Sequence, residues 1–273
     1  MTQTVRHDPG PAFRTLHQPA NPFILANAWD IGSARMLAAL GAEALATSSA
    51  AHAFTLGLTD GCVTRDQALA HAADLVAATP LPVSGDFENG FADAPDAVAE
   101  TVRLAAEAGL AGISIEDIIP ANGSPYDFEL AVERIRAAAA AARALPRDFV
   151  LVARADGVMT GSYDIAEALR RIRAFDAAGA DCLYVPMPQT RDDLAAVCKA
   201  TSKPVNALAA GPYTALSRAD FAALGVARIS LGSALARVTH RAIHDAAKAM
   251  FGTGDFTPLS HSISGSEVDR LLS

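Results

Sequence analysis

Short apolar runs alternate with longer alanine-rich stretches along this chain. The apolar runs are bounded by glycine, proline or polar residues and show no alternating polar face, which is typical of buried parallel strands. They predict strands at residues 23–27, 44–48, 82–86, 112–116, 149–154, 182–186, 204–208 and 228–231. The stretches between them predict helices at residues 31–40, 65–78, 95–108, 128–144, 164–178, 191–201, 218–224 and 233–251.

A glycine recurs where a predicted helix gives way to the next strand, at Gly41, Gly109, Gly179 and Gly225. Glycine at a helix C-terminus supplies the left-handed conformation that ends the helix, so these positions predict αβ turns. Eight strands, each followed by a helix, within one block of about 250 residues predict an α/β fold of the (β/α)8 TIM-barrel type. The competing arrangement is an open doubly wound sheet, which favours a glycine-rich phosphate-binding turn after its first strand. This chain instead continues as Asn-Ala-Trp-Asp at residues 27–30.

The pattern predicts three segments: an N-terminal extension at residues 1–20, the barrel at 21–251, and a linker with a C-terminal helix at 252–273. The last segment is rich in Gly, Thr, Ser and Pro before it becomes helical. Ser266 is the candidate N-cap of that helix, and Val268, Leu271 and Leu272 form its apolar side. A helix this short cannot bury that side alone, so we expect it to dock on the barrel or on a neighbouring subunit.

Composition narrows the function. The chain has 273 residues, 51% of them hydrophobic, and a net charge of −8. That apolar content excludes a disordered chain, and an acidic chain without a basic run argues against a nucleic-acid partner. No apolar stretch reaches the roughly 20 residues that span a bilayer, and residues 1–20 lack the apolar segment of a secretory signal. The three scattered cysteines, Cys62, Cys182 and Cys198, fit a reducing compartment, so we expect a cytoplasmic protein.

Carboxylates gather at the ends of neighbouring predicted strands, which is where a TIM barrel has its active site. Asp86 and Glu88 follow the third strand, Glu116 ends the fourth, and Arg154 ends the fifth. Regular alternation along a strand would turn Asp86 and Glu88 to the same side. Crowded carboxylates repel one another unless a cation neutralises them, and oxygen ligands without His or Cys favour Mg²⁺, with Mn²⁺ as the alternative. We therefore predict a metal site at Asp86, Glu88 and Glu116, beside which Arg154 holds a substrate carboxylate or phosphonate.

Several other polar residues also have an ordinary structural explanation, and the sequence leaves both interpretations open. These are Asp117 and Asp156 as orienting or capping groups, Ser48 and Ser49 as an N-cap pair, His52 and His71 as surface or packing residues, and His240 and His244 as an i, i+4 pair without a third metal ligand.

Five segments, taken in order, resemble the isocitrate lyase/phosphoenolpyruvate mutase superfamily across residues 22–251. They are Asn-Ala-Trp-Asp-Ile-Gly-Ser-Ala-Arg at 27–35, Thr-Ser-Ser at 47–49 leading to Leu-Gly-Leu-Thr-Asp-Gly at 56–61, Gly-Asp-Phe-Glu-Asn-Gly-Phe at 85–91, Ile-Ser-Ile-Glu-Asp at 113–117 and Val-Ala-Arg-Ala-Asp at 152–156. Each segment is weak evidence alone. Their order and spacing together carry the resemblance.

The resemblance implies Mg²⁺-dependent chemistry on an enolpyruvate-like species. It implies that Asp86 binds the metal directly, that Glu88 and Glu116 bind it through water, and that Asp60 is a further acid at the metal and substrate. Arg154 is the implied anchor of the substrate carboxylate or phosphonate. The other implied substrate contacts are Trp29, Thr47, Ser48, Ser49 and Asn206, with Asn122 as a polar lid residue. The family also exchanges a C-terminal helix between subunits, which implies a homo-oligomer, a dimer or a tetramer.

The chain departs from the family at informative places. The paired acids usually read Asp-x-Asp, whereas this chain has Asp86-Phe87-Glu88, which keeps the charge. The loop at 117–126 reads Asp-Ile-Ile-Pro-Ala-Asn-Gly-Ser-Pro-Tyr. It lacks the Cys, Lys and His of the isocitrate and methylisocitrate lyases and the lysine-bearing lid of the phosphoenolpyruvate mutases. Met187 stands where the lyases place Glu. These departures argue against isocitrate lyase itself and leave the substrate open.

We therefore expect an enzyme, a Mg²⁺-dependent lyase or decarboxylase that cleaves a C–C bond next to a 2-oxo or 2-hydroxy carboxylate through an enolpyruvate-like intermediate. Arg154, Asp60 and Glu116 are the expected catalytic residues. The Ser48 and Ser49 N–H groups are expected to act as an oxyanion hole. A decarboxylation needs no protein base, whereas a retro-aldol cleavage needs one, for which Asp60 and Tyr126 are the candidates.

Two alternatives stay open. The first is chemistry at phosphorus: a phosphoenolpyruvate or carboxyphosphonate phosphomutase, or a phosphonopyruvate hydrolase. The same metal and Arg154 suit a phosphoryl group equally well. The second is a barrel that binds metal and a small carboxylate without turnover.

Overall fold

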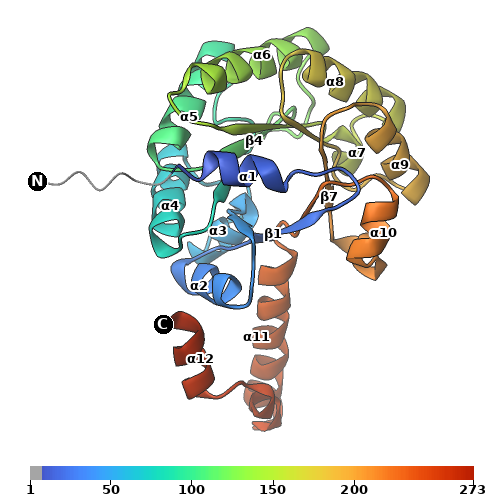
Figure 1. The fold of residues 1–273 in the computed structure, drawn as a ribbon. Helices are drawn as coiled ribbons and strands as arrows, with labels where there is room; N and C mark the ends of the chain where they lie inside the picture. The colour runs from blue at the N-terminus through green and yellow to red at the C-terminus, as the bar shows by residue number, and fades with distance from the viewer. Residues whose placement is uncertain (1–7) are drawn as a thin grey trace, which may run out of the picture.

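The computed structural model describes residues 8–273 and confirms the predicted TIM barrel (Figure 1). Eight parallel strands pair in chain order, and β1 pairs with β8 to close the sheet. The strands are β1 (Phe23–Asn27), β2 (Ala44–Ala46), β3 (Val83–Asp86), β4 (Gly112–Glu116), β5 (Val150–Arg154), β6 (Cys182–Tyr184), β7 (Val205–Leu208) and β8 (Arg228–Ser230). Every predicted strand is present, and the differences are confined to strand ends.

The predicted helices are confirmed and surround the sheet. They are α2 (Ile31–Ala39), α4 (Arg65–Ala78), α5 (Pro95–Glu107), α6 (Phe128–Ala144), α8 (Ile165–Ala177), α9 (Arg191–Lys199), α10 (Arg218–Ala223) and α11 (Ala234–Thr253). Local sequence explains their starts: at α4, the Thr64 side chain accepts the Gln67 N–H while the Gln67 side chain accepts the Thr64 N–H, a capping box. The expected αβ-turn glycines have the left-handed conformation, with φ of 97° at Gly41, 94° at Gly109, 104° at Gly179 and 92° at Gly225.

Five short elements were not predicted, because each is too short to show helical periodicity. They are α1 (Gly10–Leu16), α3 (Ser49–Thr55), α7 (Gly157–Thr160) and the 3₁₀ turns η1 (Gly211–Ala215) and η2 (Thr257–His261). Of these, α3 and α7 follow β2 and β5 directly, so they shape the rim where the strands end.

The outward and inward faces of the sheet carry different kinds of side chain. Large apolar side chains such as Leu45, Ile113 and Leu151 point outward and form the main core with the helices. Inward positions near the C-terminal ends of the strands are shorter or polar, among them Ala46, Ser84 and Ser114. TIM barrels are usually filled by bulky branched side chains, so these short residues leave a cavity inside this barrel. Nearer the N-terminal end, inward side chains such as Phe23 and Val150 form a smaller apolar cluster with Phe13 of α1 (Gly10–Leu16).

Helix α1 closes the N-terminal end of the barrel. Phe13 is fully buried there against the rings of His17 and Phe23. Arg14 fastens the helix to the strand ends through ion pairs with Asp148 at 2.6 Å and Asp181 at 2.8 Å. This helix lies within the predicted extension at 1–20, of which residues 1–7 fall outside the described residues.

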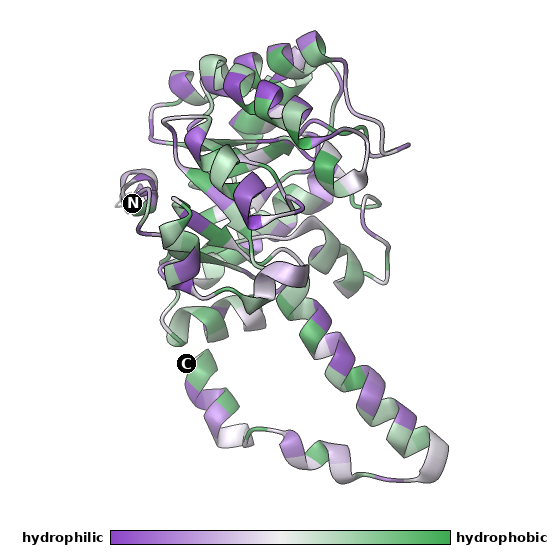
Figure 2. Ribbon diagram, turned by 90° about the vertical axis from the view of Figure 1, so that its right-hand side faces the viewer, coloured by the Kyte–Doolittle hydropathy of each residue, from purple (hydrophilic) through white to green (hydrophobic). Residues whose placement is uncertain are grey.

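The C-terminal segment leaves the barrel and returns to it, as Figures 1 and 2 show. Along α11 only Ala236 is buried, and α12 (Gly265–Leu272) packs back on α2, where Leu271 is buried. The N-cap of α12 is Ser264, which accepts the Glu267 N–H at 3.2 Å. The prediction of Ser266 was wrong, because the helix begins at Gly265 and Ser266 lies within its first turn. Among the described residues, none of the helices combines the length and apolarity needed to cross a membrane.

The buried His17 predicts acid sensitivity. Burial, and then nearby Arg228, lower the pKa of His17 to about 3, and its Nδ1 donates to the Phe13 carbonyl at 2.9 Å. The unfolded chain therefore binds more protons than the folded chain between pH 3 and 6.5, so stability falls as the pH is lowered through that window. We expect His17→Phe to reduce the loss of unfolding free energy between pH 6.5 and 4.5 by roughly 1–2 kcal/mol. Urea unfolding at several pH values measures this. The exposed His261→Gln is the control, and a His17→Phe variant that loses as much stability as the wild type would show the idea to be wrong.

Candidate active site

A cavity of about 330 Å³ lies at the C-terminal ends of the strands and extends into the barrel. Its volume is at the lower end of the range for small-molecule sites, which suits a small acid. Several predicted residues line it: Thr47, Ser48, Ser49, Asp60, Asp86, Glu116 and Arg154. Because the closed sheet collects all eight strand ends in one ring, residues far apart in sequence meet here, as predicted.

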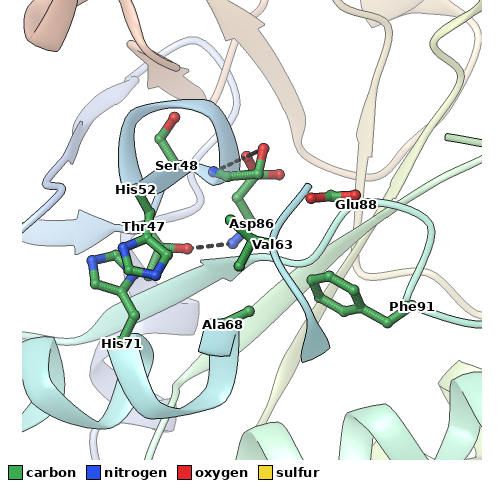
Figure 3. Close-up of a pocket in the computed structure, with 10 residues that line it drawn as sticks. Thr47, Ser48, His52, Val63, Ala68, His71, Asp86, Glu88 and Phe91 are labelled. Atoms are coloured by element: carbon green, nitrogen blue, oxygen red, sulfur yellow. Dashed lines mark hydrogen bonds between the residues drawn. The ribbon is translucent and has the colours of Figure 1, made fainter. Parts of the chain in front are cut away.

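The carboxyl group of Asp86 is held in one orientation by β2 and α3. The Asp86 N–H donates to Thr47 Oγ1 at 2.8 Å, and Asp86 Oδ2 accepts the Ser49 N–H at 3.0 Å and the Ser49 hydroxyl at 3.1 Å. Figure 3 shows the contact between Asp86 and Thr47 as a dashed line. The expected oxyanion hole is corrected at Ser49, because its N–H is engaged by Asp86. The Ser48 hydroxyl caps α3 by accepting the Ala51 N–H.

Arg154 lies among the carboxylates and is in direct contact with them. Its Nη1 is 2.9 Å from both Asp86 Oδ1 and Glu116 Oε1, and its Nη2 is 2.6 Å from Asp156 Oδ1. Burial opposes the charge of Arg154, but Asp156, Glu116 and Asp86 together outweigh it and raise the pKa of Arg154 above its usual value. A substrate carboxylate must therefore displace at least one of these partners to bind the guanidinium.

Glu88 reaches the site by a route that strand alternation did not predict. Strand β3 ends at Asp86, and Glu88 has a φ of 46°, a left-handed conformation that is strained for a residue other than glycine. Its side chain lines a second, small pocket of about 10 Å³, enough for one water molecule. Figure 3 shows Glu88 on one side of Asp86 and the stacked rings of His52 and His71 on the other.

The acids around Asp86 perturb one another. Burial first, and then the charges of Asp86 and Asp60, raise the pKa of Glu88 to about 7. The pKa of Asp60 is raised by desolvation and by Asp86, and burial raises that of Glu116 against the opposing effect of Arg154. One guanidinium thus faces an excess of negative charge.

These residues fit a hard divalent cation. All the donors are carboxylate oxygens, and Glu88 Oε1 is buried without a hydrogen-bond partner. Within residues 8–273, however, no three His, Cys, Asp or Glu side chains already surround one point as metal ligands, since Glu116 turns to Arg154. The assignment of Asp86, Glu88 and Glu116 as ligands stays a prediction.

A buried arginine holds the strained loop that carries Glu88. Arg134 is 1% exposed and donates to the carbonyls of Asn89, Ala92 and Glu116. Burial lowers the pKa of this guanidinium. Because its bonds go to backbone carbonyls on two strand ends, Arg134 fixes the loop after β3 against the end of β4.

A second network holds the neighbouring strand ends. Asp117 is 2% exposed; its Oδ1 accepts the Asp156 N–H at 2.9 Å, and its Oδ2 accepts the Tyr163 hydroxyl at 2.7 Å and Arg171 Nη1 at 3.0 Å. Asp117 is therefore an orienting group. Asp156 in turn pairs with Arg154, so Asp117 supports the position of the guanidinium from behind.

Four other candidate residues lie outside both cavities. Trp29 is half-buried, and its carbonyl accepts the His71 Nε2–H at 3.0 Å. Asn122 is exposed on the loop after β4, where its side chain accepts the Ser124 N–H. Tyr126 is buried, donates to Asp93 and accepts from Asn89, which makes it unsuitable as a base. Asn206 is fully buried beneath the cavity wall.

Several residues that line the cavity were not predicted from sequence, among them Arg228 and Ser230 on β8. Both were inside a predicted strand, and their spacing of two places them on one face of it. A charged residue at the start of a buried barrel strand is unusual, and this feature of the sequence could have identified Arg228 as a candidate site residue. His52 and His71 are packing residues: burial lowers both pKa values, that of His71 to about 4.

Comparison with known proteins gives a consistent result. The sequence profile of the phosphoenolpyruvate phosphomutase family matches residues 13–251. A Mycobacterium tuberculosis protein without an assigned activity is 35% identical over 266 residues, 96% of each chain. Oxaloacetate decarboxylase of Paraburkholderia xenovorans is 33% identical over 232 residues, which cover 81% of this chain and 75% of that one. A solved structure from Burkholderia cenocepacia J2315, provisionally described as a lyase/mutase, has a TM-score of 0.94 at 46% identity, with 98% and 96% of the two chains covered.

The Asp117 network predicts a large stability effect. We expect Asp117→Ala to lower the free energy of unfolding by about 3 kcal/mol, because it leaves Arg171 without its most buried partner. Asp117→Asn, which keeps the shape and removes the charge, should fall between this variant and the wild type. Urea unfolding at pH 7 measures both. The exposed pair of Glu267 and Arg270 supplies the control, since Glu267→Ala should barely move the midpoint. Equal effects of Asp117→Ala and Glu267→Ala would refute the role given to Asp117.

Proposed function

Because this chain belongs to the isocitrate lyase/phosphoenolpyruvate mutase superfamily, we propose that it is a Mg²⁺-dependent lyase or decarboxylase acting next to a 2-oxo or 2-hydroxy carboxylate. The observation that carries the proposal is the excess of carboxylates over a single guanidinium, at the mouth of a cavity sized for a small diacid. The similarity to oxaloacetate decarboxylase supports it. Mn²⁺ is the alternative metal.

The reaction needs negative charge to be stabilised where it develops. Cleaving a C–C bond beside a carbonyl leaves an electron pair on an enolate oxygen. When bound, the divalent ion supplies positive charge at that oxygen. Asp86 is the proposed direct ligand, because Thr47 already holds its backbone N–H and Ser49 holds its carboxyl group. Glu88 and Glu116 are the proposed ligands through water.

Arg154 is the proposed substrate anchor. Its guanidinium exchanges a carboxylate partner of the protein for the substrate carboxylate, which orients the bond to be broken. Asp156 keeps Nη2 in place during that exchange. Since Tyr126 is tied to Asp93 and Asn89, Asp60 is the candidate that remains for proton transfer, and it lines the cavity with a raised pKa. Decarboxylation requires no base, so this site suits it well.

Phosphonate chemistry is the second candidate, favoured by the match to the phosphoenolpyruvate phosphomutase profile. Arg154 and a metal would bind a phosphonate as well as a carboxylate. The loop at 118–125 carries no lysine to cover such a group, which places this candidate second.

We also propose that the protein is a cytoplasmic homo-oligomer, a dimer or tetramer, in which the C-terminal helix α12 is exchanged between subunits and takes on a second copy the place that it has on α2 of its own chain. Apolar side chains stand exposed along the segment that precedes it, among them Val238, Ile243, Phe251 and Phe256. Burying them against a second copy would remove this apolar surface from water.

The central test removes Asp86. We expect Asp86→Ala to reduce Mg²⁺-dependent turnover at least about 100-fold, because the metal would lose its direct ligand. Pyruvate release from a panel of 2-oxo and 2-hydroxy diacids measures the lyase reaction. Phosphorus NMR with phosphonopyruvate and phosphoenolpyruvate measures the alternative. The circular dichroism spectrum should stay that of the wild type.

The matched control is Asp66→Ala, which removes an exposed acid from α4 and should leave turnover unchanged. Full activity of Asp86→Ala in the presence of a chelator would sink the metal mechanism. Thermal stabilisation of the wild type by Mg²⁺ and oxalate, an enolate mimic, without turnover of any panel member would instead identify a binding protein.

A further inference from the structure

Arg228 lies deeper in the barrel than the carboxylate site. It is the first residue of β8 and pairs in register with Phe23, the first residue of β1, whereas Arg154 is the last residue of β5. Its side chain lines the 330 Å³ cavity and is 4% exposed. The cavity therefore has a guanidinium at its mouth and another on its inner wall.

The charge of Arg228 has no counterion. Its Nε donates to Asn206 Oδ1 at 2.9 Å, Nη1 is buried without a hydrogen-bond partner, and Arg228 forms no ion pair with any residue in 8–273. Asp86 is the carboxylate whose charge acts on Arg228, and it is already paired with Arg154. His17 is neutral, and burial raises the pKa of Cys182 to about 11 and that of Tyr184 to about 12, so both stay uncharged.

The other buried arginines have more partners. Arg154 contacts three carboxylates and Arg171 contacts Asp117 and Glu167. Arg134 has one buried nitrogen without a partner, its Nε, but its other two nitrogens donate to three carbonyl groups. Arg228 has one side-chain partner, so a bound anion would supply what its buried charge lacks.

We propose that Arg228 binds a second anionic group of the substrate, which makes the substrate a dianion such as a dicarboxylate. The reacting 2-oxo or 2-hydroxy carboxylate lies at Arg154 and Asp86, and the distal carboxylate extends inward to the Arg228 guanidinium, whose planar fork matches a carboxylate. The placement of the reacting end rests on the proposed function. The assignment of Arg228 rests on its own burial and missing partner.

Two neighbouring residues, Asn206 and Ser230, hold Arg228 in position. Asn206 is a positioning residue: its Oδ1 fixes Arg228 Nε, and its Nδ2 donates to the Ser230 hydroxyl at 2.9 Å. Ser230 lines the cavity beside Arg228, where its hydroxyl accepts from Asn206, lies 3.5 Å from the Ala207 carbonyl and bonds Tyr184. This explains why Asn206 is fully buried and does not line the cavity.

Unreactive probes test the inference. Calorimetry with Mg²⁺ compares succinate with butyrate, and glutarate with valerate, so that each pair differs by one carboxylate. In the wild type we expect the dicarboxylate to bind at least about 10-fold more tightly than its partner. In Arg228→Met the ratio should fall to about one, while the affinity for oxalate, which is too short to reach Arg228, should change less than about threefold.

Two further variants protect the test against a folding defect. Asn206→Asp keeps Arg228 but gives it a carboxylate partner, so it should also abolish the preference for dicarboxylates. Arg228→Lys keeps the positive charge but loses the planar guanidinium, so it should retain part of the preference for dicarboxylates. Arg173→Met removes one exposed positive charge and should keep the wild-type ratio.

A wild type without preference for dicarboxylates, or an Arg228→Met variant that keeps the wild-type ratio, would overturn the inference and leave Arg228 a structural residue. A wild type that prefers succinate through Arg228 but does not bind oxalate with Mg²⁺ would support the inference and overturn the proposed function.

Discussion

The contact between Arg154 and its carboxylates is the interaction around which the site is organised. Closing the sheet forces neighbouring strand ends together, and Glu116 and Arg154 are direct register partners of β4 and β5. Asp86 joins them from β3, where β2 and α3 fix its carboxyl group. Without the guanidinium, these buried acids would repel one another and take up protons. The barrel therefore holds a ring of crowded carboxyl groups in which one guanidinium pairs with three acids and burial still raises the pKa of Glu88 and Glu116.

Packing of the helices on the sheet supplies the stability that offsets the burial of these charged groups. The main hydrophobic core lies between the outer face of the sheet and the helices, and a smaller apolar cluster around Phe13 and Phe23 fills the N-terminal end of the barrel. The C-terminal part of the interior is then free for polar and short side chains. Arg134 and Asp117 bind the loops behind the site from this outer layer, and they act on backbone atoms and on other charges without entering the cavity.

The fold was predictable because each buried strand has a continuous apolar run and each helix has its own caps and closing glycine. Strand order alone predicted which residues meet at the cavity mouth. It did not predict the contacts among these residues, because those depend on side-chain and backbone conformation. Arg154 turns to Asp86 and Glu116, and Glu88 reaches its pocket through a positive φ. Arg228 was missed because its depth depends on the register between β8 and β1, which hydrophobic pattern does not encode.

Ala46, Ser84 and Ser114 give the chamber its volume, and none of them carries a charge. A methyl group added at Ala46 or Ser84 would narrow the chamber from within while the acidic rim and both arginines stayed in place. Ser114 differs, because its hydroxyl contacts Asp86 Oδ1 at 3.4 Å. The choice of acid can thus change through a few atoms on the inner wall while the ionic groups remain the same.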